Sequence, residues 1–410
     1  MRHDARMTDV PTPAEIRLLG PGEFRAANTL FRGSLHHPPA TDEAWALRGV
    51  SYEEGRVYGA YRDDTLVGTA LSYSGELCVP GGALVPMAMV TAVGVRADHT
   101  RRGVLTQLMR AQLSGLADPV ATLRASESAI YGRFGYGVAT RVRTVVVNRR
   151  RAVPRASAPD GGSVRLLRLD EAHDLLPALY DRVSIRRPGW TSRPMGWWNA
   201  TRTWAAERDV HSMVAVHSGP DGDDGFAAYA VERKDDQTVL AVHDFFYDRA
   251  EVWAALWRFL LTVDLVDRVR CDFRPLDEPV EELMVDRGQV ETTQVGDETW
   301  LRLVDVPAAL AARQFGELAP GAGSVVVEVR DPFLPANSGR YLLGDGPARQ
   351  VAEPPALTMD VDVLAQLYLG AIAPSVLADA GRIGVVKADA LPVADRLFAV
   401  SGAPWCGTFF

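Results

Sequence analysis

Two stretches of the sequence combine residue types that could do chemistry. Residues 123–137 read LRASESAIYGRFGYG and offer the hydroxyls of Ser126 and Tyr131 ahead of a turn of aromatics and glycines. Residues 98–105 read DHTRRGVL and place two arginines and a glycine where a helix should begin. A helix N-terminus carries unpaired amides and partial positive charge, and glycine lets a phosphate approach the backbone closely. The pair of stretches predicts a thioester cofactor whose diphosphate rests on residues 98–105 and whose sulfur meets residues 123–137.

Strands and a helix must position these two stretches. Residues 57–62 and 65–71 flank Asp63-Asp64 and predict two strands around a tight turn, and residues 87–95 predict a further strand. A helix is then predicted to begin near Arg102, because apolar residues recur at helical spacing. These residues are Val104, Leu105, Leu108, Met109 and Leu113. Residues 120–123 form a short strand after Pro119 that delivers the chain to Ser126. The basic turn on its own is equally compatible with a solvated helix cap.

A second α/β unit follows a strand at 140–147 and a Pro/Ala/Gly-rich linker at 153–162. The charge run Arg149-Arg150-Arg151 before the linker is interpreted as a solvated loop. Residues 226–232 and 238–246 repeat the hairpin pattern, and a helix then buries an apolar face made of Trp253, Leu256, Trp257, Leu260 and Leu261. No Arg-Arg-Gly turn precedes that helix, so this unit resembles a copy of the first without the cofactor turn.

A third unit begins near Val306, with strands predicted at 324–329 and 339–343 and helices around 363–370 and 375–377. The chain ends on Phe409 and Phe410 after Pro404-Trp405-Cys406. Chain ends are usually polar and mobile, so an apolar end predicts docking into a pocket. The alternative is a tail that only seals a domain interface.

Composition limits the function further. The chain has 410 residues, 47% hydrophobic and 23% charged, and a formal net charge of −8, which argues against a nucleic-acid binder. Its length predicts two or three domains. The three cysteines have no disulfide or metal-ligand spacing, so no metal site is predicted and a cytoplasmic location is expected. No apolar run approaches the roughly 18 residues of a membrane span, and the N-terminus lacks a secretory signal pattern.

Residues 93–105, VGVRADHTRRGVL, resemble the acetyl-CoA motif of GCN5-related N-acetyltransferases (GNATs). Ala125-Ser126-Glu127 followed by IYGRFGYG at 130–137 is similar to the signature of the Eis (enhanced intracellular survival) branch. The resemblance covers essentially the whole chain. It implies an α/β (α+β) fold of tandem GNAT-like domains, each with a mixed central sheet flanked by helices, followed by a sterol-carrier-protein-like domain. The expected domains are 1–152, catalytic with the acetyl-CoA site, 153–305, degenerate, and 306–410, which donates the C-terminal carboxylate.

The resemblance also implies roles for individual residues. Tyr131 is the expected general acid for the departing CoA thiolate, and the terminal carboxylate of Phe410 the expected general base. The rings of Phe409 and Phe410 are expected to fix that carboxylate by burial. The alternative for Tyr131 is a packed core tyrosine, and for Ser126 a helix cap or turn serine rather than a contact to the cofactor. The expected acetyl-CoA contacts are Val93, Val95, Arg101, Arg102, Gly103, Val104, Leu105 and Ser126, the two valines offering backbone groups to the pantetheine arm.

The acceptor pocket is expected to be less acidic than in the family's aminoglycoside-acetylating members. Those carry acidic side chains beside the terminal Phe and in the early loop, whereas this chain has Phe409 and the segment 31–34, FRGS. The candidate substrate-binding residues are Phe31, Trp45, Arg124, Trp198 and Phe409, with Arg124 adding positive charge. Trp45, Trp197 and Trp198 are equally compatible with core positions. A less acidic pocket predicts weaker binding of polycationic antibiotics.

Three functions remain open at this point. The first is an acetyl-CoA-dependent N-acetyltransferase acting on aminoglycosides or other amine drugs, or on lysine side chains of peptides. The second is a binding protein that uses the sterol-carrier-like domain for an apolar ligand, and the third a non-catalytic scaffold. The resemblance also implies a homo-hexamer built as a trimer of dimers.

Overall fold

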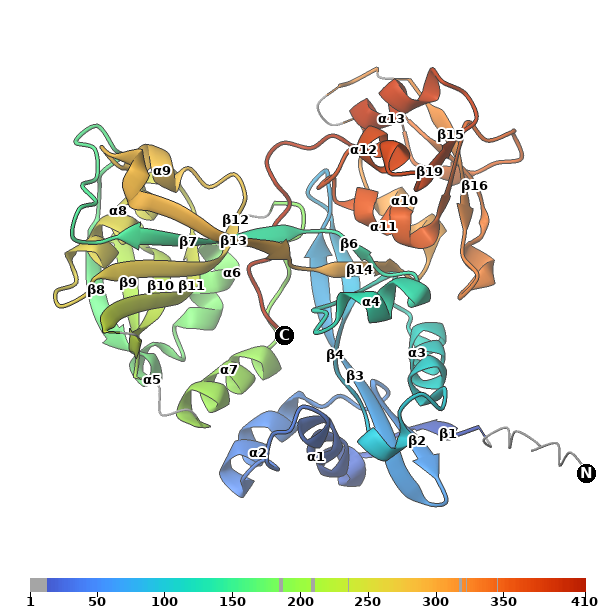
Figure 1. The fold of residues 1–410 in the computed structure, drawn as a ribbon, viewed down its shortest axis with the longest axis horizontal. Helices are drawn as coiled ribbons and strands as arrows, with labels where there is room; N and C mark the ends of the chain where they lie inside the picture. The colour runs from blue at the N-terminus through green and yellow to red at the C-terminus, as the bar shows by residue number, and fades with distance from the viewer. Residues whose placement is uncertain are drawn as a thin grey trace, which may run out of the picture. The chain divides into compact units, whose positions relative to one another are not determined.

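The computed structural model describes residues 13–183, 187–207, 211–234, 236–316, 319–321, 323–344 and 346–410. The N-terminal residues 1–12, in which no secretory signal is predicted, lie outside this range. The chain divides into two compact units, one formed by residues 1–73 and 90–117 and the other by residues 74–89 and 118–410. Figure 1 labels the helices and strands of both units.

The first unit is a sheet covered by helices on both faces. Val57 and Tyr58 are neighbours on β2, so their side chains point to opposite faces of the sheet. Val57 packs with Phe24 and Ala27 of α1, and Tyr58 packs in a separate cluster with Val104 and Leu108 of α3. The elements are β1 (Glu15–Leu18), α1 (Phe24–Ser34), α2 (Asp42–Arg48), β2 (Val57–Arg62), β3 (Thr65–Cys78), β4 (Leu84–Val95) and α3 (Val104–Gly115).

Strands β3 and β4 belong to both units. In the first unit the strand order is β1-β2-β3-β4, and in the second unit β3 and β4 continue with β5-β14-β6. Strand β5 (Val120–Leu123) pairs parallel to Met87–Met89 of β4. Strand β14 (Trp300–Leu303) pairs antiparallel to both β5 and β6 (Gly137–Val138). Strand β14 therefore belongs to the first sheet, although it follows all the strands of the second sheet in the sequence.

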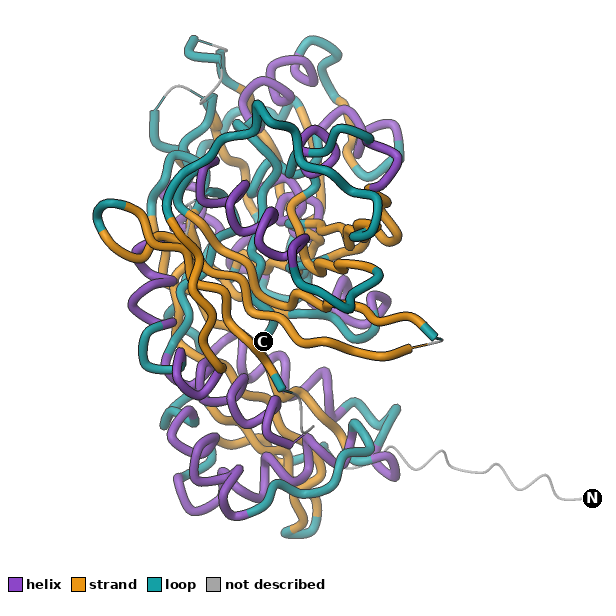
Figure 2. Tube along the Cα trace, turned by 90° about the vertical axis from the view of Figure 1, so that its left-hand side faces the viewer, coloured by secondary structure: helices purple, strands orange, loops and turns teal. Residues whose placement is uncertain are grey.

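The second sheet has the strand order β13-β7-β12-β11-β10-β9-β8. Figure 2 shows these strands side by side. Strand β7 (Arg141–Asn148) lies before the expected domain boundary at residue 152 but pairs here, between β12 and β13. The other elements are β8 (Ser163–Arg168), α5 (Leu169–Ala172), α6 (Leu176–Val183), α7 (Met195–Glu207), β9 (Ser212–Gly219), β10 (Gly222–Lys234), β11 (Gln237–Tyr247), α8 (Ala250–Thr262), β12 (Arg268–Pro275), α9 (Val280–Leu283) and β13 (Val290–Asp297).

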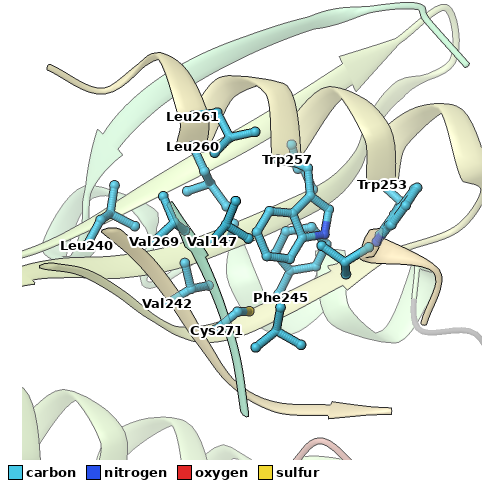
Figure 3. Close-up of a cluster of buried hydrophobic side chains, with 14 of the residues drawn as sticks. Val147, Leu240, Val242, Phe245, Trp253, Trp257, Leu260, Leu261, Val269 and Cys271 are labelled. Carbon is cyan, nitrogen blue, oxygen red and sulfur yellow. The ribbon is translucent and has the colours of Figure 1, made fainter. Parts of the chain in front are cut away.

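Helix α8 packs on one face of the second sheet through the apolar side chains that the sequence predicts. Trp257 is fully buried, and its ring centroid lies 5.8 Å from that of Phe245 on β11 (Figure 3). The same cluster contains Val147 of β7 and Val269 of β12. The predicted hairpin is also confirmed, since β10 and β11 pair antiparallel from Gly225 to Lys234.

The C-terminal domain has a five-stranded sheet of order β17-β16-β15-β18-β19 (orange to red in Figure 1). Its predicted strands and helices are present with small shifts at their ends. The elements are α10 (Val306–Ala312), β15 (Val325–Arg330), β16 (Gly339–Leu343), β17 (Arg349–Gln350), β18 (Leu357–Asp360), α11 (Val361–Tyr368), α12 (Pro374–Asp379), β19 (Ile383–Val385) and α13 (Ala390–Phe398). The mixed sheets and flanking helices confirm the α/β class. Among the described residues, none of the helices has the length and apolarity to cross a membrane.

Candidate active site

The basic turn leads directly into α3, as predicted, although the helix begins at Val104 rather than near Arg102. Gly103 is the N-cap residue and adopts a left-handed conformation with φ of 78°. Because glycine has no side chain that could cap the helix, the amides of the first turn are left to a ligand or to water. Arg101 and Arg102 are exposed beside them, while Val104 is 1% exposed and anchors the helix in the core. The turn therefore presents amides and two cations on a rigid base, which suits a diphosphate.

Strand β4 is irregular at the segment that should face a pantetheine arm. Ala92, just before Val93, has φ of 48°, a left-handed conformation that costs a non-glycine residue on the order of 1–3 kcal/mol. Strand β4 pairs in parallel with β5 only at Met87–Met89, although β4 continues to Val95. Val93 and Val95 are half-buried against the cluster under α3. The segment from Val90 to Val95 can thus offer backbone groups to an extended ligand.

A cavity of about 620 Å³ lies in the first unit beside this segment. Helix α1 and the residues after it contribute Thr29, Ser34 and His36, and the end of β4 and the turn after it contribute Val95 and Asp98. Asp98 is the single carboxylate among the described lining residues, and it already pairs with Arg96 at 2.8 Å. The cavity therefore has little uncompensated negative charge.

Tyr131 ends the short helix α4 (Ser128–Tyr131), and the aromatic–glycine turn follows it. Gly135 adopts a left-handed conformation with φ of 85°, and a Cβ there would lie 2.8 Å from Val361 of α11. A Cβ on Gly137 would likewise lie 2.8 Å from Gln366 Cγ of α11. Gly135 and Gly137 are thus required by backbone conformation or by close packing against the C-terminal domain, whereas Gly132 has a helical conformation and open space around it.

Tyr131 is 8% exposed, and its ring stacks edge-to-face on Tyr136 with centroids 5.9 Å apart. Burial, and secondarily the negative charge of Glu127, raises the pKa of Tyr131. The phenol is therefore protonated throughout the neutral range, as a general acid requires. Ser126 lies one residue outside the helix, because Glu127 is the N-cap residue, and its side chain is exposed. It is not the helix cap that the sequence left open as an alternative.

The C-terminal tail, residues 403–410, runs from α13 to the second sheet and ends beside α7 (Figure 1). Trp405 is 5% exposed, stacks on Phe246 at 5.0 Å, and donates from Nε1 to the carbonyl oxygen of Phe273 at 2.7 Å. Trp405 is thus buried in the apolar cluster of the second sheet, which fits both the expected docking and the alternative of a tail that seals a domain interface. Phe410 is half-buried, but the expected burial of Phe409 is wrong, because its side chain is 62% exposed. The partly exposed Phe409 ring lies 6.0 Å from the ring of Phe273 and 5.7 Å from the Arg124 guanidinium carbon. The backbone is held as well, because Trp197 Nε1 donates to the Phe409 carbonyl oxygen at 2.5 Å.

Arg124 holds the tail and does not add free positive charge to a pocket. Its guanidinium pairs with Glu298 at 3.0 Å and donates from Nε to the carbonyl oxygen of Thr408 at 3.1 Å. Trp198, the neighbour of Trp197, is 4% exposed in the aromatic core with Tyr180. Arg124 therefore has structural contacts that the sequence did not suggest, whereas Trp198 occupies the core position that the sequence left open as its alternative.

The remaining candidate substrate residues lie in the first unit. Phe31 on α1 and Trp45 on α2 are both half-buried against the same apolar cluster. Trp45 packs edge-on against Tyr52, with ring centroids 5.4 Å apart. Neither residue lines the cavity described above.

Residues 247–249, which lead into α8 of the second sheet, read YDR and contain no Arg-Arg-Gly turn. Helix α8 follows Arg249, whose backbone is extended. The Arg249 guanidinium pairs with Asp224 at 2.6 Å and with Asp248 at 2.7 Å. The arginine run before the linker lies in a surface turn, in line with the expected solvated loop. Arg149 and Arg150 pair there with Asp264 and Asp267, and the Arg150 side chain is 73% exposed.

Sequence reasoning missed Arg193, which is the most heavily engaged cation near the tail. It pairs with Asp244 through both amino groups at 2.7 and 3.0 Å, and it donates from Nε to the hydroxyl of Thr408 at 3.0 Å. Burial opposes its charge, but Asp244 offsets this and raises the pKa of Arg193. The signal in the sequence was a single arginine between Trp190 and Trp197.

Comparison with protein-family models matches an acetyltransferase (GNAT) domain to residues 15–139, a second to residues 189–303, and a sterol carrier protein domain to residues 306–407. The N-acetyltransferase Eis of Mycobacterium tuberculosis is 37% identical over 396 residues, covering 92% of this chain and 94% of that protein. An uncharacterised N-acetyltransferase of Streptomyces avermitilis is 33% identical over 98% of this chain and 99% of its own length.

Among solved structures, Eis1 from Mycobacterium abscessus superimposes with a TM-score of 0.87 at 37% identity, covering 97% of this chain and 100% of that one. A GCN5-related N-acetyltransferase from Anabaena variabilis, at 19% identity and a TM-score of 0.81, shares the fold. With two acetyltransferase domains, a sterol-carrier-like domain and Eis relatives along nearly its whole length, the chain belongs to the Eis family of GCN5-related N-acetyltransferases.

Proposed function

We propose that the chain transfers the acetyl group of acetyl-CoA to a small-molecule amine by direct attack, with Tyr131 as general acid and the Phe410 carboxylate as general base. The amine nitrogen bonds to the thioester carbonyl carbon, the carbon–sulfur bond breaks, and Tyr131 protonates the departing thiolate. The carboxylate takes the proton that the amine loses. The observation that carries the proposal is the burial of Tyr131 at the end of α4, which raises the pKa of its phenol.

The residues of the basic turn fit the co-substrate. The uncapped amides of α3 and the exposed Arg101 and Arg102 would hold its diphosphate, with the 3′-phosphate as a further partner for either arginine. Val93 and Val95 would hold the pantetheine arm through their backbone groups. Gly103, Val104 and Leu105 form the start of the helix on which this grip depends. Ser126 stays a predicted contact to acetyl-CoA.

The acceptor in this proposal is an amine of low positive charge. The cavity beside Val95 in the first unit has one carboxylate among its described lining residues, Asp98, and Arg96 already pairs with it. A polycationic aminoglycoside would find few partners there. Assembly as a hexamer and a cytoplasmic location stay predictions from the family resemblance.

Thiol release from acetyl-CoA with a panel of amines tests the activity. We expect turnover with hydrophobic monoamines and a lower kcat/KM with kanamycin, and peptides with a single lysine serve as the comparison for a protein substrate. Absence of turnover with every amine would contradict the proposal. Kanamycin acetylation as efficient as in aminoglycoside-acetylating relatives would contradict the assigned acceptor class while leaving the activity intact.

Replacing Arg102 by alanine tests the cofactor grip. Losing a charged hydrogen bond worth about 1.5–3 kcal/mol should raise KM for acetyl-CoA roughly ten- to hundredfold, with kcat at saturation little changed. Arg151→Ala removes one exposed charge from a loop and is the control, with KM expected to stay constant. Repeating the assay with 3′-dephospho-acetyl-CoA separates the two phosphates, because an arginine that binds the 3′-phosphate should no longer matter. An unchanged KM in Arg102→Ala would remove this residue from the site.

A further inference from the structure

The second sheet has the same strand–helix–strand plan that carries the cofactor site of the first. Strand β4 leads into α3 and returns as β5, and β11 leads into α8 and returns as β12. The parallel register of β11 and β12 covers Val239–Val242 and Arg268–Cys271. Beyond it β11 continues to Tyr247, just as β4 continues beyond its own pairing with β5. In the first sheet, the end of the corresponding strand β4 is the part proposed above to hold the pantetheine arm.

In this chain, the tail contacts that end of the second sheet. Trp405 stacks on Phe246 of β11 and bonds to the Phe273 carbonyl oxygen of β12. Asp244 of β11 holds Arg193, and Arg193 bonds to the carbonyl oxygen of Gly407 at 3.2 Å. The position that would serve a cofactor in a catalytic sheet is therefore occupied by the chain's own C-terminus.

Arg193 is enclosed by aromatic rings on its other sides. Its guanidinium carbon lies 4.1 Å from the ring centroids of Tyr180 and Trp197 and 4.7 Å from that of Phe246. Its side chain is 1% exposed, so its bonds are made away from water, where they are stronger. This arrangement resembles an aromatic cage for a cation, with the chain's own arginine in it.

A second buried ion pair holds the tail from the first sheet. Glu298 accepts from the backbone nitrogen of Gly407 at 2.7 Å and from that of Cys406 at 3.1 Å. Its partner Arg124 bonds to the Thr408 carbonyl oxygen. Residues 406–409 thus have backbone or side-chain bonds at each position, ending at the Phe409 carbonyl oxygen on Trp197.

We propose that the second acetyltransferase-like domain acts as a clamp for the C-terminus, with Arg193 as the positioning residue that aligns residues 407–409 and so fixes where the Phe410 carboxylate lies. The clamp is a property of these contacts alone, and its consequence for catalysis rests on the proposed role of that carboxylate. Arg193 touches neither reacting group. It acts through Thr408 and Gly407, which lie two and three residues before Phe410, whose side chain is half-buried.

Release of Phe410 by carboxypeptidase A measures the clamp independently of catalysis. In Arg193→Gln, which keeps a polar group but loses the bidentate pair, we expect release about ten times faster than in the unchanged protein. Thr408→Val keeps the Arg193–Asp244 pair and removes one bond, so release should rise about threefold. Arg143→Gln is the matched control, because Arg143 is also a buried arginine of this domain, pairing with Glu281, and has no recorded contact with the described tail.

Steady-state acetylation with the same variants separates the two proposals. Faster release with a lower kcat supports both the clamp and the role of Phe410. Faster release with unchanged kcat supports the clamp and contradicts the carboxylate as base. Release at the original rate in both variants overturns the clamp, whatever the activity. If Arg193→Gln does not fold, Thr408→Val decides the question alone.

Discussion

Replacing Tyr131 by phenylalanine is expected to lower kcat about 10²–10³-fold while KM for acetyl-CoA stays within about twofold, because loss of a general acid typically costs 10²–10⁴-fold. Phenylalanine keeps the edge-to-face stacking on Tyr136, so the loss should be one of proton transfer and not of folding. Burial raises the pKa of Tyr131 above that of a free tyrosine, which is about 10. The rate should therefore show no decline from this group between pH 7 and about 10, which a pH profile of kcat checks.

Tyr136→Phe is the matched control for that measurement. The Tyr136 hydroxyl is buried and has no hydrogen-bond partner among the described residues, so its removal should change kcat little. Equal losses in the two variants would mean that the turn tolerates no change, and would remove the evidence for Tyr131 as the acid. A Tyr131→Phe enzyme with normal kcat would contradict the mechanism directly.

Extending the chain by Gly-Ser past Phe410 is expected to lower kcat/KM about 10²-fold, since the carboxylate is displaced while every side chain is retained. Phe410→Leu is the control, because it changes the half-buried ring and keeps the terminal carboxylate in place, whereas the extension keeps the ring and displaces the carboxylate. Its loss of activity should be smaller, about tenfold or less, from reduced apolar burial. Thiol release at saturating acetyl-CoA measures both variants. Full activity in the extended chain would show that the base lies elsewhere.

The sequence predicted what depends on local patterns. The spacing of Trp253, Trp257 and Leu260 predicted the buried face of α8, and the glycines around Tyr136 predicted a tight turn, because both follow from backbone geometry within one element. The left-handed Gly103 before α3 is likewise a local requirement of the turn.

Contacts between distant segments could not be predicted in this way. Arg124 was assigned to the acceptor pocket from its place beside Ser126, but its charge is balanced by Glu298, which lies 174 residues away. Phe409 was expected to be buried because it is aromatic, whereas the structure holds its carbonyl oxygen and leaves its ring exposed. Hydrophobicity predicts which side chains avoid water, and it contains no information on which backbone groups a distant arginine or tryptophan will bond.

The exchange of strands between the two sheets has a consequence for synthesis. Residues 120–138 can pair with β14 only after Leu303 has left the ribosome, so the sheet that leads to Tyr131 stays incomplete while the next domain is being made. Until then the nascent chain exposes the unpaired edges of β5 and β6, which are sites for mispairing and aggregation. The two acetyltransferase-like domains therefore mature together during translation, and separating them at the linker would leave the first sheet without β14, the strand that joins β5 to β6.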